Sequence, residues 1–274
     1  MPDFVEPDIL FGRLWLLYRW GRFALKSSFN MDLDFCWNAF RAAALLPLYT
    51  LRDVFNREYE CNICGWRGSQ FYPNTGPGNF ERNTICPRCH CQNRHRTLLR
   101  LLLDKTDLFD RSRTVIEVAP MRTFQKYCLA MKGRDGYISF DYERFAMEKG
   151  DITQMRYDNE SCNYFICMHV LEHIIEEERA LSEIMRVLKC GGALVIQVPI
   201  DKELDETIEY GKPDPRQSGH VRQYGRDFAD RLTHYGFEVE DLTVTDYLPE
   251  EQIVFHGFCR EPIYIARKPK VPTG

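Results

Sequence analysis

The sequence predicts an α/β fold in which helices cover both faces of a mostly parallel sheet. Short apolar runs alternate with amphipathic helical patterns from residue 93 onward, as repeated β-α-β units do. A segment rich in Cys, Gly, Pro and Asn comes before them, and a helical pattern precedes that segment. We therefore expect three parts: an N-terminal helical segment (1–50), a small Cys-rich module (51–92) and the α/β domain (93–274).

The N-terminal segment is predicted to contain two helices, near residues 8–27 and 33–46, the second ending at Pro47. Three basic residues share one face of the first helix: Arg19, Arg22 and Lys26. We favour a helix that packs on the main domain with this face in water. The alternative is a helix that lies on an anionic membrane surface and gives peripheral membrane contact.

The Cys-rich module contains two C-x-x-C pairs, Cys61 with Cys64 and Cys86 with Cys89. Two such pairs can close a tetrahedron of thiolates around Zn²⁺, and the turn formers between them could hardly build a core without a metal. Four protein ligands leave no coordination position for a substrate, so we predict a structural zinc site. Three neighbours are alternative ligands: His90, Cys91 and His95.

A helix with a basic start is predicted immediately after the second pair, over residues 93–103. We favour arginines there that are solvated or paired with acidic neighbours. The alternative is contact with the phosphates of a nucleic acid. These arginines are Arg94, Arg96 and Arg100. The net charge of −4 predicts no general affinity for nucleic acid, so such contact would be local.

The elements of the α/β domain follow from its apolar periodicity. The predicted strands cover 114–118, 137–141, 150–152, 164–168, 193–198, 237–245 and 263–267. The predicted helices cover 123–131, 176–188 and 228–235, the second closed by Gly191 and Gly192. The polar segment 201–224 is expected to overhang the sheet. Ligands of such a sheet bind beyond the carboxyl ends of its strands.

One stretch resembles a known family. The run His169-Val170-Leu171-Glu172-His173-Ile174, followed by Ala180 to Gly192, is similar to the "VLEH…RVLKPGG" stretch of class I S-adenosylmethionine-dependent methyltransferases of the type 11 kind, with Cys190 replacing the usual Pro. The whole chain resembles bacterial proteins that place a C-x-x-C ribbon before such a domain. They share "CPRC…RHR" and "HVR-x-YG" elements, matched here by Cys86 to Arg96 and His220 to Gly225. The resemblance implies a Rossmann-like class I methyltransferase sheet with S-adenosylmethionine as its cofactor.

The resemblance also implies cofactor-binding residues at matching positions. Asp141 would hydrogen-bond the ribose, because a carboxylate can accept from both hydroxyls of a diol; the alternative is an acid that caps a turn. Asp151 and Ile152 would border the adenine. Met168 and His169 would line the floor near the methionine moiety.

The loop after the first strand departs from the family pattern, which is an acid followed by G-x-G-x-G. Glu117 keeps the acid, whereas Ala119, Met121 and Thr123 stand at the glycine positions. A side chain there hinders close approach of the backbone to a cofactor. Either the loop takes another course, as the Ala-Pro of the bacterial relatives supports, or cofactor binding is weakened or lost. We retain Glu117 and Ala119 as predicted cofactor-binding residues.

Methyl transfer needs a positioned acceptor and often a base. We predict His220 and His169 as bases, because a neutral imidazole accepts a proton near pH 7. For His220 the alternative is a loop histidine that makes one backbone hydrogen bond. Arg222 and Tyr224 are expected to orient a polar or anionic acceptor. His173 is a third candidate base, for which we favour a packing or capping role.

Three functions remain open. We favour S-adenosylmethionine-dependent methyl transfer to a small-molecule, lipid-linked or saccharide acceptor. The alternatives are a zinc-ribbon RNA methyltransferase, for which the sequence offers no Asn-Pro-Pro-aromatic motif, and a non-catalytic scaffold that has lost the cofactor. The odd number of scattered cysteines, the lack of a basic leader and the lack of a long apolar stretch indicate a cytoplasmic protein without a transmembrane segment.

Overall fold

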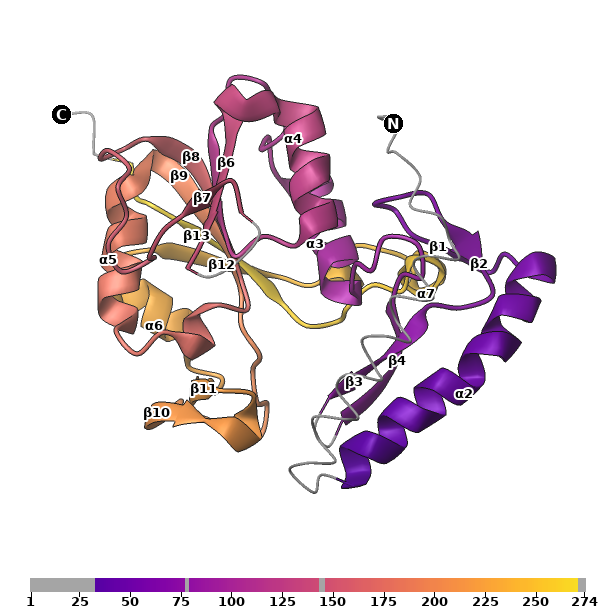
Figure 1. The fold of residues 1–274 in the computed structure, drawn as a ribbon. Coiled ribbons are helices and arrows are strands. Elements are labelled where there is room, and N and C mark those ends of the chain that lie inside the picture. Colours follow the sequence, from indigo (N-terminus) through magenta and orange to yellow (C-terminus); the bar gives the residue numbers. More distant parts are fainter. Residues whose placement is uncertain (1–32, 77–78, 143–145, 271–274) are drawn as a thin grey trace. The chain divides into compact units, whose positions relative to one another are not determined.

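The structure is a computed structural model that describes residues 33–76, 79–142 and 146–270. The chain divides into two compact units. Unit 1 comprises the residues up to Arg100 together with Val244–Arg260, and unit 2 comprises Leu101–Thr243 and the residues from Glu261 onward (Figure 1). The helix predicted near residues 8–27, with its proposed membrane contact, lies outside the described residues.

Unit 1 contains a long helix, α2 (Leu33–Phe55), that runs along a β-hairpin (Figure 1). Pro47 lies inside this helix, so the prediction that it ends the helix is wrong. The packing of α2 against β2, β3 and β4 compensates for the hydrogen bond that proline cannot donate. The strands are β1 (Tyr59–Glu60), β2 (Arg67–Gly68), β3 (Tyr72–Gly76) and β4 (Asn79–Ile85), paired as two antiparallel hairpins.

Two further helices belong to the described part of unit 1. The predicted helix after the second C-x-x-C pair is confirmed as α3 (Asn93–Lys105), which continues across the boundary into unit 2. The sequence did not predict α7 (Glu250–His256), which lies against β1. It is only two turns long, too short for helical periodicity to stand out. Unit 1 thus takes residues from two distant parts of the chain.

Unit 2 is built on a seven-stranded sheet with the order β12-β13-β9-β8-β5-β6-β7. These strands are β5 (Val115–Val118), β6 (Tyr137–Asp141), β7 (Glu148–Lys149), β8 (Cys162–Met168), β9 (Leu188–Gln197), β12 (Glu238–Leu242) and β13 (Ile263–Arg267). All neighbours from β9 to β7 are parallel, whereas β13 is antiparallel to both β9 and β12. The predicted mostly parallel sheet is confirmed.

Helices cover both faces of this sheet, as predicted. In Figure 1, α4 (Arg122–Gly136) lies on one face, and α5 (Glu177–Val187) and α6 (Phe228–His234) lie on the other. The core between sheet and helices is aromatic and aliphatic, with Phe140, Phe165 and Phe228 each at most 1% exposed. Two scattered cysteines, Cys162 and Cys167, lie in this core as small apolar side chains. Among the described helices, none is both long and apolar enough to cross a bilayer.

Two elements of unit 2 differ from the prediction. The third strand is β7, just before the expected residues 150–152, because the carboxylate of Asp151 accepts from the N–H and hydroxyl of Thr153 and closes a turn there. Gly191 and Gly192 do not close α5 but lie in β9, which begins directly after the helix. Glycines follow helices so commonly that the sequence pattern favoured a cap.

The polar segment 201–224 contains an antiparallel hairpin that the sequence did not predict. Its strands are β10 (Ile208–Asp214) and β11 (His220–Gln223), and it protrudes below α6 in the view of Figure 1. Most of β10 is exposed, so its sequence lacks the apolar alternation that marks a half-buried strand.

Candidate functional site

The carboxyl ends of three adjacent strands meet at one edge of the sheet in unit 2. Val118, the last residue of β5, pairs with Phe140 of β6 on one side and with Cys167 of β8 on the other. From β5 the chain continues to β6 and β7 in one direction, and later to β8 and β9 in the other. Such a reversal of strand order opens a crevice that binds ligands in open α/β sheets. The candidate site is therefore at this edge.

The loop after β5 makes a left-handed turn although it has no glycine. Ala119 has φ of 50°, and its N–H donates to the carbonyl of Phe140 at 2.8 Å. The side chain of Met121 folds back onto the start of α4, where its sulfur accepts from the N–H of Thr123 at 3.1 Å. The loop thus adopts a conformation that usually requires glycine, and the exposed residue Ala119 carries the resulting backbone strain.

Glu117 lies within the sheet and not in the loop. It is 3% exposed, and its carboxylate accepts a hydrogen bond from the hydroxyl of Tyr137. Burial raises the pKa of Glu117 to about 8, against the lowering effect of that hydrogen bond. The group is therefore largely protonated at neutral pH, and a direct contact between Glu117 and a cofactor stays a prediction.

The structure brings some of the other predicted cofactor-binding residues together. Asp141 ends β6 and Met168 ends β8, so both flank the end of β5, and both are half-buried. Ile152 is 3% exposed and belongs to the core. Asp151 closes the turn described above. Asp141, Ala119 and Met168 therefore share the candidate site, whereas Asp151 and Ile152 have structural contacts of their own.

Three histidines and a glutamate cluster beside this edge. His169 directly follows β8 with φ of 56°, and its Nδ1 lies 3.4 Å from Oε1 of Glu172. The rings of His173 and His220 meet edge to face, with centroids 4.9 Å apart. One ligand atom from each of Glu172, His173 and His220 lies within 4.8 Å of the others. The structure thus joins both predicted bases to Glu172 and to His173, for which the sequence favoured a packing or capping role.

Glu172 is the member that sequence reasoning missed. It lies in the short 3-10 helix η1 (Leu171–His173) and is 1% exposed. The available signal was the spacing H-x-x-E-H from His169 to His173, which places three polar groups on little more than one turn. Burial lowers the pKa of His220, although the carboxylate of Glu172 acts in the opposite direction, so this imidazole is neutral near pH 7.

Arg222 and Tyr224 do not face an acceptor, and that prediction is wrong. The guanidinium of Arg222 is 3% exposed and donates to the carbonyls of Leu171 and Ile174 at 2.7 and 2.6 Å. The hydroxyl of Tyr224 donates to the buried carboxylate of Glu177. Arg222 therefore holds β11, which begins with His220, against the segment that carries Glu172 and His173.

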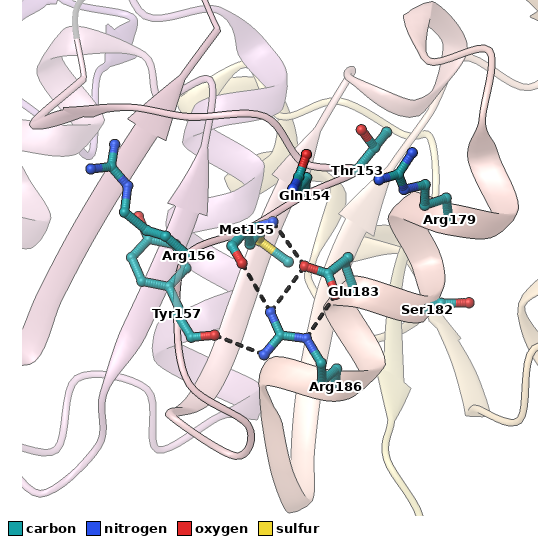
Figure 2. Close-up of a pocket in the computed structure, with 9 residues that line it drawn as sticks. All are labelled: Thr153, Gln154, Met155, Arg156, Tyr157, Arg179, Ser182, Glu183 and Arg186. Carbon is teal, nitrogen blue, oxygen red and sulfur yellow. Dashed lines mark hydrogen bonds and ion pairs between the residues drawn. The ribbon is translucent and has the colours of Figure 1, made fainter.

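A pocket of about 430 Å³ lies between α5 and residues 153–157, and none of the predicted site residues is among those that line it. Figure 2 shows its most connected member, Arg186, which donates to the carboxylate of Glu183 and to the carbonyls of Met155 and Tyr157. Glu183 in turn accepts from the N–H of Met155 at 2.8 Å. These bonds fasten residues 153–157 to α5, so we interpret the pocket as part of the scaffold.

The four cysteines of the two C-x-x-C pairs converge in unit 1. Their sulfurs all lie within 4.8 Å of one another, with Sγ–Sγ distances of 3.7 Å for Cys61–Cys89 and for Cys64–Cys86. Zinc bound tetrahedrally by thiolates at about 2.3 Å separates its sulfurs by about 3.8 Å. The donor set and its spacing therefore fit Zn²⁺.

The two C-x-x-C turns have the same backbone hydrogen bonds. Cys61 and Cys86 each donate to the carbonyl five residues later, and each accepts from the N–H four residues later, which belongs to Gly65 and His90. Gly65 and His90 both take left-handed conformations, with φ of 69° and 60°. Of the alternative ligands, Cys91 has its sulfur 3.4 Å from that of Cys61, and Nδ1 of His95 accepts from the N–H of Gln92.

Arg96 is neither solvated nor able to reach a phosphate, so both interpretations of this residue are wrong. Its side chain is fully buried, with its guanidinium carbon 3.7 Å from the centroid of the Phe71 ring. It donates to backbone carbonyls that lie far apart in sequence: those of Thr84, Cys91, His256 and Gly257. Arg96 therefore ties α7 to the cysteine module.

Comparison with known proteins identifies the domain. Residues 104–196, which include β5 to β9, match the family model of a methyltransferase domain. This match lies within unit 2 and agrees with the resemblance found in the sequence.

One relative is a probable S-adenosylmethionine-dependent methyltransferase of Mycolicibacterium smegmatis, 27% identical over 117 residues. The match covers 42% of this chain and 40% of the relative's length. Solved structures that are similar include the 1,6-didemethyltoxoflavin-N1-methyltransferase of Burkholderia thailandensis, with S-adenosylhomocysteine bound (13% identity, TM-score 0.43, 64% of this chain and 87% of that chain). Another is the CurJ carbon methyltransferase (16% identity, TM-score 0.43, 64% of this chain and 53% of that chain).

Proposed function

We propose that unit 2 binds S-adenosylmethionine and transfers its methyl group to a small-molecule, lipid-linked or saccharide acceptor. The family match of residues 104–196 supports this, and one structural observation carries it. Ala119 directly follows β5, and Asp141 and Met168 end the neighbouring strands β6 and β8, at the point where strand order reverses. That is where an α/β sheet holds a nucleotide-like ligand.

The residues at this edge have distinct proposed roles. The cofactor supplies an electrophilic methyl group on a sulfonium. Asp141 accepts from the ribose hydroxyls, and Met168 lines the floor beside the methionine moiety. His169 removes the acceptor's proton: with Nδ1 directed at Glu172, the buried Nε2 has no hydrogen-bond partner among the described residues. His220 faces the acceptor from β11.

The cysteine cluster is proposed to hold a structural Zn²⁺. Its four thiolates complete the coordination shell, so the ion stabilises unit 1 and takes no part in methyl transfer. The alternative function as an RNA methyltransferase has less support, because Arg96, one of the arginines expected to contact phosphates, is buried in unit 1.

Calorimetric titration of the zinc-loaded protein with S-adenosylmethionine and S-adenosylhomocysteine tests the proposal. We expect binding of both, and a loss of about tenfold to a hundredfold in affinity for Asp141→Ala, as for hydrogen bonds to a charged group worth about 1.5–3 kcal/mol. Asp230→Ala, an exposed acid on α6, is the matched control and should bind as wild type does. No binding by a folded wild-type protein would refute the enzyme function in favour of a non-catalytic scaffold.

A further inference from the structure

The buried carboxylate of Glu172 has one oxygen without a hydrogen-bond partner among the described residues. Its other oxygen lies 3.4 Å from His169. A buried carboxylate oxygen without a donor or cation is costly, so native structures generally supply one. The nearest side chains that could share a ligand with this carboxylate are the imidazoles of His173 and His220.

We propose that Glu172, His173 and His220 form a binding site for a divalent transition-metal cation at the carboxyl edge of the sheet. One carboxylate and two imidazoles are a donor set that Mn²⁺, Fe²⁺, Co²⁺ and Zn²⁺ accept, and it leaves coordination positions open. Three evenly spaced ligand atoms about 2.1 Å from one ion lie at most about 3.6 Å apart. The present spacing, within 4.8 Å, therefore needs each ligand atom to shift by less than about an ångström.

The surroundings hold these three ligands in place. Nδ1 of His173 lies 3.4 Å from the carbonyl of Gly219, an arrangement that leaves Nε2 free for a metal. Arg222 fastens β11 to the segment 171–175 through backbone carbonyls. His169 contacts Oε1 of Glu172, as outer partners of metal ligands do, and Oε2 has no hydrogen-bond partner among the described residues that would compete with an ion. The need to hold His220 beside Glu172 and His173 accounts for the burial of Arg222 in a hairpin that otherwise protrudes.

The cation would define the acceptor class, and this step rests on the proposed methyl transfer. A hydroxyl oxygen bound at an open position has a lowered pKa, as metal-bound water has. Its proton passes to Nε2 of His169, its electron pair forms the new C–O bond, and the S–CH₃ bond breaks with its pair left on sulfur. The products are a methyl ether and a neutral thioether. His220 then acts as a metal ligand and not as a base, and the acceptor is an alcohol or a phenol.

Titration with Mn²⁺, followed by the electron paramagnetic resonance of the free ion, tests the site without cofactor or acceptor. Mn²⁺ prefers oxygen and nitrogen ligands, so it leaves a zinc-loaded cysteine cluster untouched. We expect one Mn²⁺ per chain, with at least tenfold weaker binding in His173→Ala, His220→Ala and Glu172→Gln. His234→Ala, an exposed histidine on α6, should bind as wild type does.

Because His173 is exposed, we expect His173→Ala to fold as wild type does, and thermal unfolding of each variant checks that it is folded. Lack of Mn²⁺ binding at millimolar concentration by folded wild-type protein would overturn the proposal, as would unchanged affinity in folded His173→Ala and His220→Ala. Because no methyl donor is present, this result is independent of the calorimetric test of S-adenosylmethionine binding, and either proposal can fail alone.

Discussion

The buried carboxyl of Glu117 makes the stability of unit 2 depend on pH. An exposed glutamate in the unfolded chain has a pKa near 4.5, whereas burial raises that of folded Glu117 to about 8. Between these values the folded state keeps a proton that the unfolded state has lost. The free energy of unfolding therefore falls as pH rises from about 4.5 to about 8 and then levels off. One pKa unit corresponds to about 1.4 kcal/mol, so the whole decrease is roughly 5 kcal/mol.

The substitution Glu117→Gln removes this dependence. The amide cannot ionise, yet its oxygen still accepts from the hydroxyl of Tyr137. We expect the variant to match wild type near pH 4.5 and to exceed its unfolding free energy by several kcal/mol near pH 8.5. Glu117→Leu is the control: it cannot ionise either, but it leaves the buried hydroxyl of Tyr137 without an acceptor, so we expect it to be less stable than Glu117→Gln by about 1–3 kcal/mol at every pH.

Urea unfolding of cofactor-free protein measures the effect. No tryptophan follows Trp66 in the sequence, so tryptophan fluorescence does not report on the sheet of unit 2, and the unfolding of unit 2 must be followed by far-ultraviolet circular dichroism. If the unfolding free energies of wild type and Glu117→Gln stay parallel between about pH 5 and about pH 8, the carboxyl is ionised in the fold and the argument is refuted.

Two further predictions concern the cysteine cluster and the loop after β5. Cys86→Ser should lower the zinc content measured by atomic absorption and shift the unfolding transition of unit 1 followed by tryptophan fluorescence. Cys190→Ser, at an exposed cysteine outside the cluster, should change neither quantity. Full zinc occupancy in Cys86→Ser would exclude Cys86 as a ligand. Ala119→Gly should raise the thermal stability of unit 2 by up to about 1 kcal/mol, because glycine takes a positive φ without strain. A lower melting temperature for Ala119→Gly would show that the turn is not strained.

Local patterns in the sequence predicted much of the fold. The strand over 137–141 and the strand over 263–267 form at the predicted residues, because a buried strand between helical patterns has few other interpretations. The convergence of four cysteines was also predictable, since each C-x-x-C turn is a local structure and only the meeting of the two turns is long-range. The match of residues 104–196 to a methyltransferase domain agrees with the "VLEH" resemblance.

The sequence by itself determined the fold class and the candidate metal and cofactor regions, because apolar periodicity and ligand spacing are written over short stretches of chain. Only the tertiary structure decided which polar residues are buried. The sequence favoured a solvated or paired Arg96 and an Arg222 that orients an acceptor, but each is held inside by backbone carbonyls from distant segments. For the same reason the pairing of Glu172 with His220 could not be predicted, since a hairpin brings them together across the chain and no local pattern records that contact.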